Sequence, residues 1–263
     1  MLLTKNEKSF LEGSSVRVGG RPLEPSARRA SLGLIVPSVN TVVEPWFNAV
    51  VPAGVSIFAD RMLLASEVSA DSLILMDRQE GMAAATRIAT CRPDAIAYCC
   101  TASSIVQGLD YDAHLVAELG KHTGRTCFTA VGAIIEALSV FGAKSISIAS
   151  PYTQVIDEAE KKFFEDAGFR VQGTAHLNIS DGFALASPTS AEIYELALRA
   201  WQPGADVLLI SCLNMNSQYV VAELERVIGR PVITSTTATL WKLLRSAGVS
   251  DRIEGFGRLL QDF

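Results

Sequence analysis

Residues 115–125 read LVAELGKHTGR, and residues 220–230 read VVAELERVIGR. The second segment repeats the apolar and acidic positions of the first and ends on the same Gly-Arg pair. Each segment has the pattern of a helix. An internal repeat of this kind predicts a chain built from two similar structural units.

The repeat extends on both sides of these helices. Downstream, GRTCFTAVGAIIEAL corresponds to GRPVITSTTATLWKLL. Upstream, DAIAYCC ending at Cys100 corresponds to ADVLLISC ending at Cys212, and IVPSVN at 35–40 corresponds to IASPYTQ at 148–154. Because strand, loop and helix recur in the same order, we expect two similar halves rather than one continuous sheet.

Short β-branched runs alternate with longer amphipathic segments, as in GLIVP at 33–37 and the helical stretch from about residue 69 to residue 90. This alternation predicts an α/β fold with parallel sheets. In such sheets, ligands bind beyond the carboxyl ends of the strands. Two facing halves related by a pseudo-two-fold axis would therefore form one active site in the cleft between them.

The boundaries of the two halves follow from the repeat. Residues 1–28 are rich in Ser, Gly, Arg and Lys without periodicity, and we expect a flexible tail there. Residues 29–128 plus 241–263 are predicted to form the first α/β half, and residues 129–240 the second.

Two helices are expected to cross between the halves. They cover residues 129–142 and 234–248, and each ends on a glycine, which adopts the left-handed conformation at a helix end at little cost. The final GFGRLL, residues 255–260, is predicted to add a strand to the first half.

Composition excludes several functions. The 263 residues carry a net charge of -5 without a basic stripe, so no nucleic-acid partner is expected. No apolar run is long enough to span a bilayer and the N-terminus lacks a signal-peptide core, which predicts no membrane partner and a cytoplasmic location. Neither GxGxxG nor a P-loop occurs, so a nucleotide cofactor is not expected.

Cysteine and histidine usage argues against disulfides and metals. Five cysteines are too few, and odd in number, for a disulfide framework, which indicates free thiols in a reducing compartment. The three histidines are scattered and no CxxC pair occurs, so we expect no metal site.

Two of the thiols have the positions of catalytic groups. Cys100 and Cys212 each end an apolar strand at equivalent points of the repeat. We expect both to precede a helix start, where the positive end of the helix lowers a thiol pKa and attracts a carboxylate. Cys99 aligns with Ser211 and is therefore interpreted as structural. The same interpretation applies to Cys91 and Cys127.

The loops around these thiols supply the candidate substrate-binding residues. Asn40 and Tyr152 occupy equivalent first-strand loops and offer neutral hydrogen bonds to a carboxylate. The residues that follow each thiol have backbone amides able to form small anion nests. These residues are Thr101, Ala102, Leu213 and Asn214.

The chain resembles the maleate cis-trans isomerase and arylmalonate decarboxylase branch of the Asp/Glu racemase superfamily. The resemblance rests, in order, on GLIVPSVNTVVEP, AYCCTASS, ASPY, LLISC, GRPVITSTTATLW and GFGRLL. It implies two flavodoxin-like halves, no cofactor or metal, and a homodimer or homotetramer. It also implies the two-cysteine group of the branch, since arylmalonate decarboxylases have Gly in place of the first cysteine.

The resemblance implies a cofactor-independent isomerase acting on a small carboxylate or dicarboxylate. In a maleate-type reaction the Cys100 thiolate adds to the alkene, the central bond rotates, and Cys212 delivers and then removes the proton before elimination. Three alternatives stay open: a two-base racemase, a decarboxylase that uses Cys212 alone, and a small-ligand binding protein. Gly182 stands where isomerases often have Asn, and Leu213-Asn214-Met215 follows Cys212, which favours a bulkier or differently substituted acid.

Overall fold

The computed structural model describes residues 17–18, 21–22 and 29–263. Of the expected tail, it describes only strands β1 (Arg17–Val18) and β2 (Arg21–Pro22), which pair antiparallel. The rest of that expectation lies outside the described residues.

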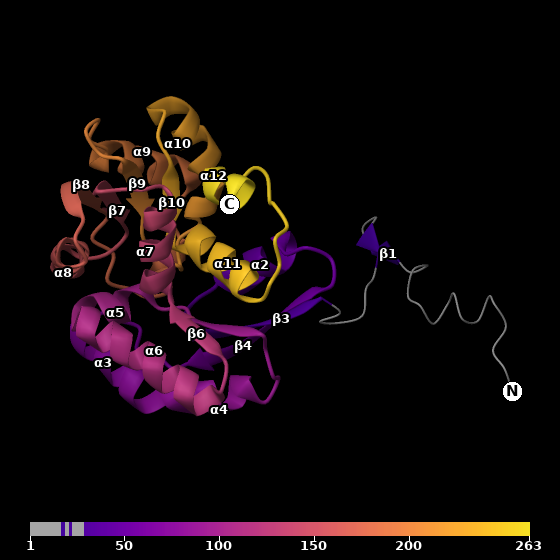
Figure 1. The fold of residues 1–263 in the computed structure, drawn as a ribbon. Helices are drawn as coiled ribbons and strands as arrows, with labels where there is room; N and C mark the ends of the chain where they lie inside the picture. The colour runs from indigo at the N-terminus through magenta and orange to yellow at the C-terminus, as the bar shows by residue number, and fades with distance from the viewer. Residues whose placement is uncertain (1–16, 19–20, 23–28) are drawn as a thin grey trace, which may run out of the picture.

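Two four-stranded parallel sheets form the centre of the fold (Figure 1). The first has the order β4-β3-β5-β6 and the second β8-β7-β9-β10, so the strand order is the same in both halves. Buried apolar side chains on both faces suit parallel strands covered by helices. The strands are β3 (Ala30–Pro37), β4 (Val55–Met62), β5 (Ala95–Tyr98), β6 (Thr126–Thr129), β7 (Ser145–Ser150), β8 (Arg170–His176), β9 (Val207–Ile210) and β10 (Val232–Thr234).

Helices flank both sheets, which confirms the predicted α/β class with two similar halves. Those of the first half are α2 (Val43–Val50), α3 (Ala70–Met76), α4 (Met82–Ala89), α5 (Thr101–Gln107) and α6 (Leu109–Thr123). Those of the second half are α8 (Gln154–Asp166), α9 (Ser190–Ala200) and α10 (Val221–Ile228), with 3-10 turns at Ala184–Ala186 and Ser217–Tyr219.

Two helices pack against each other where the halves meet, namely α7 (Ala130–Val140) and α11 (Ser235–Ser246) (Figure 1). Thr129 and Thr234 cap them at equivalent positions, each accepting a backbone N–H with its hydroxyl. Gly142 and Gly248 follow them in the left-handed region, as predicted. Helix α7 contacts β6 and β10, and α11 contacts β5 and β10, so both helices reach across the junction.

The predicted helix over residues 69–90 is interrupted by a π-helical turn. The turn covers Asp77–Gly81 between α3 and α4. A side chain at Gly81 would lie close to the Tyr98 hydroxyl, with its Cβ 3.3 Å away. The turn therefore brings Asp77 and the end of β5 together.

The prediction of a C-terminal strand is wrong. Residues after Gly257 form the short helix α12 (Arg258–Asp262), which packs on α11. Leu259 and Leu260 are both buried. Adjacent side chains point to opposite faces of a strand, whereas one helical turn places both leucines against α11.

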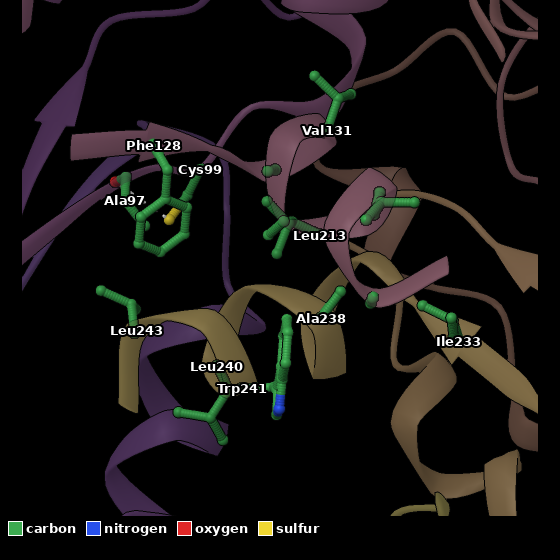
Figure 2. Close-up of a cluster of buried hydrophobic side chains, with 14 of the residues drawn as sticks. Ala97, Cys99, Phe128, Val131, Leu213, Ile233, Ala238, Leu240, Trp241 and Leu243 are labelled. Carbon is green, nitrogen blue, oxygen red and sulfur yellow. Dashed lines mark hydrogen bonds between the residues drawn. The ribbon is translucent and has the colours of Figure 1, made fainter. Parts of the chain in front are cut away.

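A buried apolar cluster spans both halves (Figure 2). Phe128 and Val131 from the β6–α7 segment lie there with Leu240 and Trp241 of α11. Cys99 is 1% exposed and belongs to this cluster. No helix within the described residues is long and apolar enough to cross a membrane.

Candidate active site

One small cavity, with a volume of about 40 Å³, contains every predicted site residue in its lining. Its walls come from loops at the carboxyl ends of strands in both sheets, as expected for open parallel sheets. The predicted residues that line it are Asn40, Cys100, Thr101, Ala102, Tyr152, Cys212, Leu213 and Asn214.

Cys100 lies between β5 and α5 and is 6% exposed. Burial raises the pKa of its thiol to about 12, the negative charge of Asp77 contributes in the same direction, and hydrogen bonds from Ser103 oppose both. The expected lowering is therefore wrong, because the cost of desolvating a thiolate exceeds the effect of the helix end. Thr101 and Ala102 begin α5, so their N–H groups have no partner within the helix.

Cys212 follows β9 in a turn, so the prediction that a helix starts directly after it is wrong. Its φ of +83° lies in the region that favours glycine and costs a non-glycine residue roughly 1–2 kcal/mol. Burial raises its pKa to about 12, while the Tyr152 phenol and the Asn214 N–H, 3.3 Å from Sγ, donate hydrogen bonds that lower it. Burial thus favours the protonated form of both thiols.

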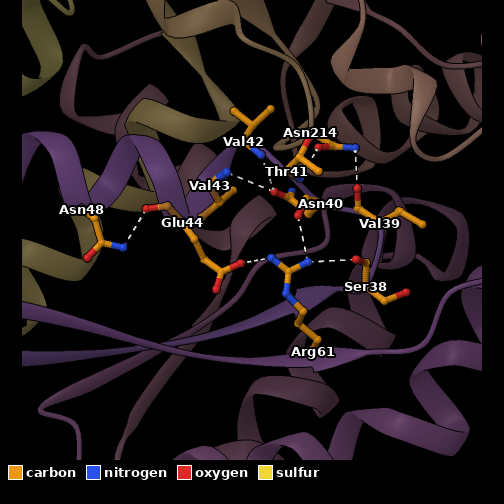
Figure 3. A network of polar contacts seen from close by, with 10 residues as sticks. All are labelled: Ser38, Val39, Asn40, Thr41, Val42, Val43, Glu44, Asn48, Arg61 and Asn214. Carbon is orange, nitrogen blue, oxygen red and sulfur yellow. Dashed lines mark hydrogen bonds and ion pairs between the residues drawn. The ribbon is translucent and has the colours of Figure 1, made fainter.

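Asn40 has two roles (Figure 3). Its Oδ1 accepts hydrogen bonds from the N–H groups of Val42 and Val43, each at 3.0 Å, at the start of α2. Its Nδ2 has no hydrogen-bond partner among the described residues. Arg61 donates a hydrogen bond to the Asn40 carbonyl at 2.9 Å and forms a salt bridge with Glu44. Asn40 therefore presents an amide donor from a braced loop.

An apolar wall, which was not predicted from the sequence, lines one side of the cavity. It consists of Leu64, Val68, Leu73 and Leu185. The loops that carry it pair across the two halves, through hydrogen bonds from the Val68 N–H to the Ser180 carbonyl and from the Gly182 N–H to the Ser66 carbonyl, both 2.7 Å. These loops follow β4 and β8, which are equivalent strands, so the repeat contained a signal for them.

Cationic groups do not line this cavity. In the described part of the chain, no group of three or more His, Cys, Asp or Glu side chains is placed to hold a metal ion. Neutral donors therefore provide the polar recognition in this site.

Two buried carboxyl groups behind the thiols were also missed. Asp77 accepts hydrogen bonds from Tyr98, Tyr111 and Gln107. Glu160 is fully buried, and burial raises its pKa to about 8. Both lie on helices that gave no sequence signal beyond amphipathic pattern.

The chain is similar to known proteins over most of its length. The arylmalonate decarboxylase family model matches residues 32–260. A maleate isomerase of Pseudomonas putida is 30% identical over 241 residues, which cover 87% of this chain and 96% of the relative. An arylmalonate decarboxylase of Bordetella bronchiseptica is 28% identical over 165 residues, covering 62% of this chain and 69% of the relative.

A solved structure shares the whole architecture. It is a cysteine-to-serine variant of the Nocardia farcinica maleate cis-trans isomerase with a covalently bound succinylcysteine intermediate, 25% identical, with a TM-score of 0.84 and coverage of 89% of this chain and 99% of that one. Family model, relatives and fold thus converge, and the chain belongs to the arylmalonate decarboxylase family, in the branch that includes the maleate isomerases.

Proposed function

We propose that this protein is a cofactor-independent cis-trans isomerase that uses two cysteines on a small unsaturated dicarboxylate of the maleate type. The observation that carries this proposal is that Cys100 and Cys212, from equivalent strand ends of the two halves, line one cavity. The maleate isomerase relatives and the succinylcysteine captured in one of them support it.

In the proposed reaction Cys100 first loses its proton to solvent, so that the reacting form has Cys100 as a thiolate and Cys212 as a thiol. The Cys100 sulfur bonds to one alkene carbon, and the π electrons move to the neighbouring carbon, which takes the proton of Cys212. The central bond is now single and rotates. The Cys212 thiolate removes the proton again, the carbon–sulfur bond breaks, and the trans product leaves with both thiols in their starting states.

The polar groups of the cavity suit this chemistry. Ser103 lies next to Cys100 and lowers the pKa of its thiol, and Tyr152 and the Asn214 N–H donate to Cys212. The free amide of Asn40 and the first N–H groups of α5 provide neutral donors for carboxylate oxygens. Since Gly182 packs against Val39 and Val68, with a Cβ there 3.1 and 3.2 Å from their methyl groups, this wall offers no further side-chain amide.

A second candidate is decarboxylation of a substituted malonate. The apolar wall of Leu64, Val68, Leu73 and Leu185 favours it, because it suits an apolar substituent. The presence of Cys100 argues against a decarboxylase, since that reaction requires only the thiol at position 212.

A proton NMR screen in deuterated water tests the proposal. Conversion of maleate or a substituted maleate to the trans isomer is the expected result, whereas release of carbon dioxide from an arylmalonate would identify a decarboxylase. Deuterium exchange at the α-carbon of 2-amino acids without isomerisation would identify a racemase.

We also propose a cytoplasmic location and a homodimer or homotetramer. Five free thiols among the described residues support a reducing compartment. Exposed apolar side chains, including Leu63, Val155 and Phe183, support association between copies. Light scattering coupled to gel filtration would measure the oligomer size.

A further inference from the structure

The side chain of Asn214 joins three loops beside the cavity, and Figure 3 shows its contacts with Val39 and Thr41. Its Oδ1 accepts the N–H of Thr41 at 2.9 Å. Its Nδ2 donates to the carbonyl of Gly182 at 2.9 Å and, at 3.4 Å, to the carbonyl of Val39. This one side-chain amide therefore connects the loop after β3, the loop after β8 and the turn after β9.

The backbone of the same residue contacts the second thiol. The Asn214 N–H donates to the Cys212 Sγ at 3.3 Å. Cys212 has a φ of +83°, so this turn holds an unfavourable conformation that surrounding contacts must maintain. The position of the hydrogen-bond donor to Cys212 is thus tied to the position of the loops that the Asn214 side chain holds.

These contacts leave the Asn214 amide without capacity for a ligand. Its oxygen and its nitrogen are both engaged with the backbone of other loops, and the residue is 5% exposed. A carboxylate would have to break one of these bonds in order to reach it. The side chain therefore does not serve as a donor to a carboxylate, and the Asn214 backbone amide, which the sequence predicts as part of an anion nest, donates to the Cys212 Sγ.

We propose that Asn214 is a positioning residue that couples closure of the cavity to the proton transfer performed by Cys212, an inference that rests on the proposed function. Both thiols are buried and the cavity that they line has a volume of only about 40 Å³, so the loops around it must move apart to admit a dicarboxylate. Separation breaks the bonds from Asn214 to Thr41 or Gly182 and frees the turn after β9. Only when the loops rejoin is the N–H donor held against Cys212.

This coupling acts at one defined point of the reaction. When Cys212 gives its proton to the carbon next to the new carbon–sulfur bond, its sulfur becomes a thiolate. The Asn214 N–H stabilises that charge until the thiolate takes the proton back and Cys100 is released. A misplaced donor slows both proton transfers and leaves the addition by Cys100 unaffected.

The test is the Asn214→Ala variant with maleate as the substrate. We expect kcat to fall by roughly 10- to 100-fold, the effect of losing one hydrogen bond to a charged group, with a much smaller change in KM. We also expect the intact mass of the protein to show a succinyl adduct on Cys100. Protonation by solvent still completes the adduct, but its removal needs the Cys212 thiolate.

Two further variants keep the test decisive. Asn216→Ala removes a neighbouring amide that contacts only the Ala186 carbonyl and Gln218, and should keep the parent kcat and carry no adduct. Asn214→Asp keeps the acceptor for Thr41 but lacks the donor to Gly182, and should give an intermediate kcat. If Asn214→Ala does not fold, Asn214→Asp is the variant whose kcat and adduct are measured instead.

Three results separate the explanations. An unchanged kcat in Asn214→Ala, or a raised KM with no adduct, would overturn the positioning role while leaving the isomerase intact. A parent protein that does not isomerise maleate, together with a Cys212→Ser variant that forms no adduct, would refute the proposed function and this inference with it. Loss of kcat together with an adduct on Cys100 would support both.

Discussion

Tyr98 donates a hydrogen bond to Asp77 at 2.5 Å, from a position two residues before Cys100. The carboxylate also accepts from Tyr111 at 2.6 Å and from Gln107 at 2.8 Å. Asp77 is 8% exposed and lies on the π-helical turn between α3 and α4. A buried negative charge is therefore fixed behind the first thiol by a set of neutral donors.

Replacing this charge should make Cys100 more acidic. After burial, Asp77 is the largest cause that raises the pKa of Cys100, while Cys212 contributes less. Asp77→Asn should lower the Cys100 pKa, which raises the thiolate fraction and makes alkylation by iodoacetamide near pH 8 several-fold faster. Mass spectrometry of the modified peptides gives the rates for Cys100 and Cys212 in the same sample.

Tyr111→Phe is the matched control for that experiment, since it removes a donor to Asp77 and keeps the charge. It should not accelerate alkylation of Cys100. Equal acceleration of both thiols in Asp77→Asn would indicate loosened packing and contradict the electrostatic explanation.

Glu160 should make the protein less stable as pH rises. Burial raises its pKa from 4.5 to about 8, and neither carboxyl oxygen has a hydrogen-bond partner in the described structure. The folded state then holds a proton that the unfolded chain releases, so the stability present below about pH 4.5 is lost progressively as pH rises to about 8. Glu160→Gln should remove this loss. The difference in the free energy of unfolding between the variant and the parent should therefore be about 4 kcal/mol more favourable to the variant at pH 8 than at pH 4.

Urea unfolding of both proteins at the two pH values measures this difference. A stability gap between parent and variant that is the same at both pH values would show that Glu160 does not titrate in this range.

Tyr152 should contribute to turnover through its hydroxyl. Tyr152→Phe keeps the buried ring but removes the donor to Cys212. A lost hydrogen bond to a charged group costs about 1.5–3 kcal/mol, so kcat should fall roughly 10- to 100-fold. Tyr219→Phe, at a side chain that is 59% exposed, should leave kcat unchanged. Equal activities in the two variants would exclude this role.

The repeat made much of the fold predictable. The matching segments that end at Cys100 and Cys212 gave equivalent strands, and Thr129 and Thr234 begin equivalent helices. The C-terminal strand was wrong because GFGRLL has no counterpart in the repeat to fix its conformation. There the contact of Leu259 and Leu260 with α11 decided the outcome.

The site was predictable where it depended on strand ends and not where it depended on tertiary contact. All eight predicted residues line the cavity, because equivalent loops converge at the carboxyl ends of parallel strands. Asp77 and Glu160 were missed because nothing in an amphipathic helix shows which polar residue will face a thiol. The raised thiol pKa values were missed because they depend on burial, which only the packed structure defines.

The most direct test of the account compares Cys100→Ser and Cys212→Ser with the parent protein on maleate, followed by proton NMR. We expect the parent protein to form the trans isomer and each variant to lose nearly all turnover. We also expect Cys212→Ser to retain a succinyl adduct on Cys100. Full turnover in both variants would contradict the two-thiol mechanism.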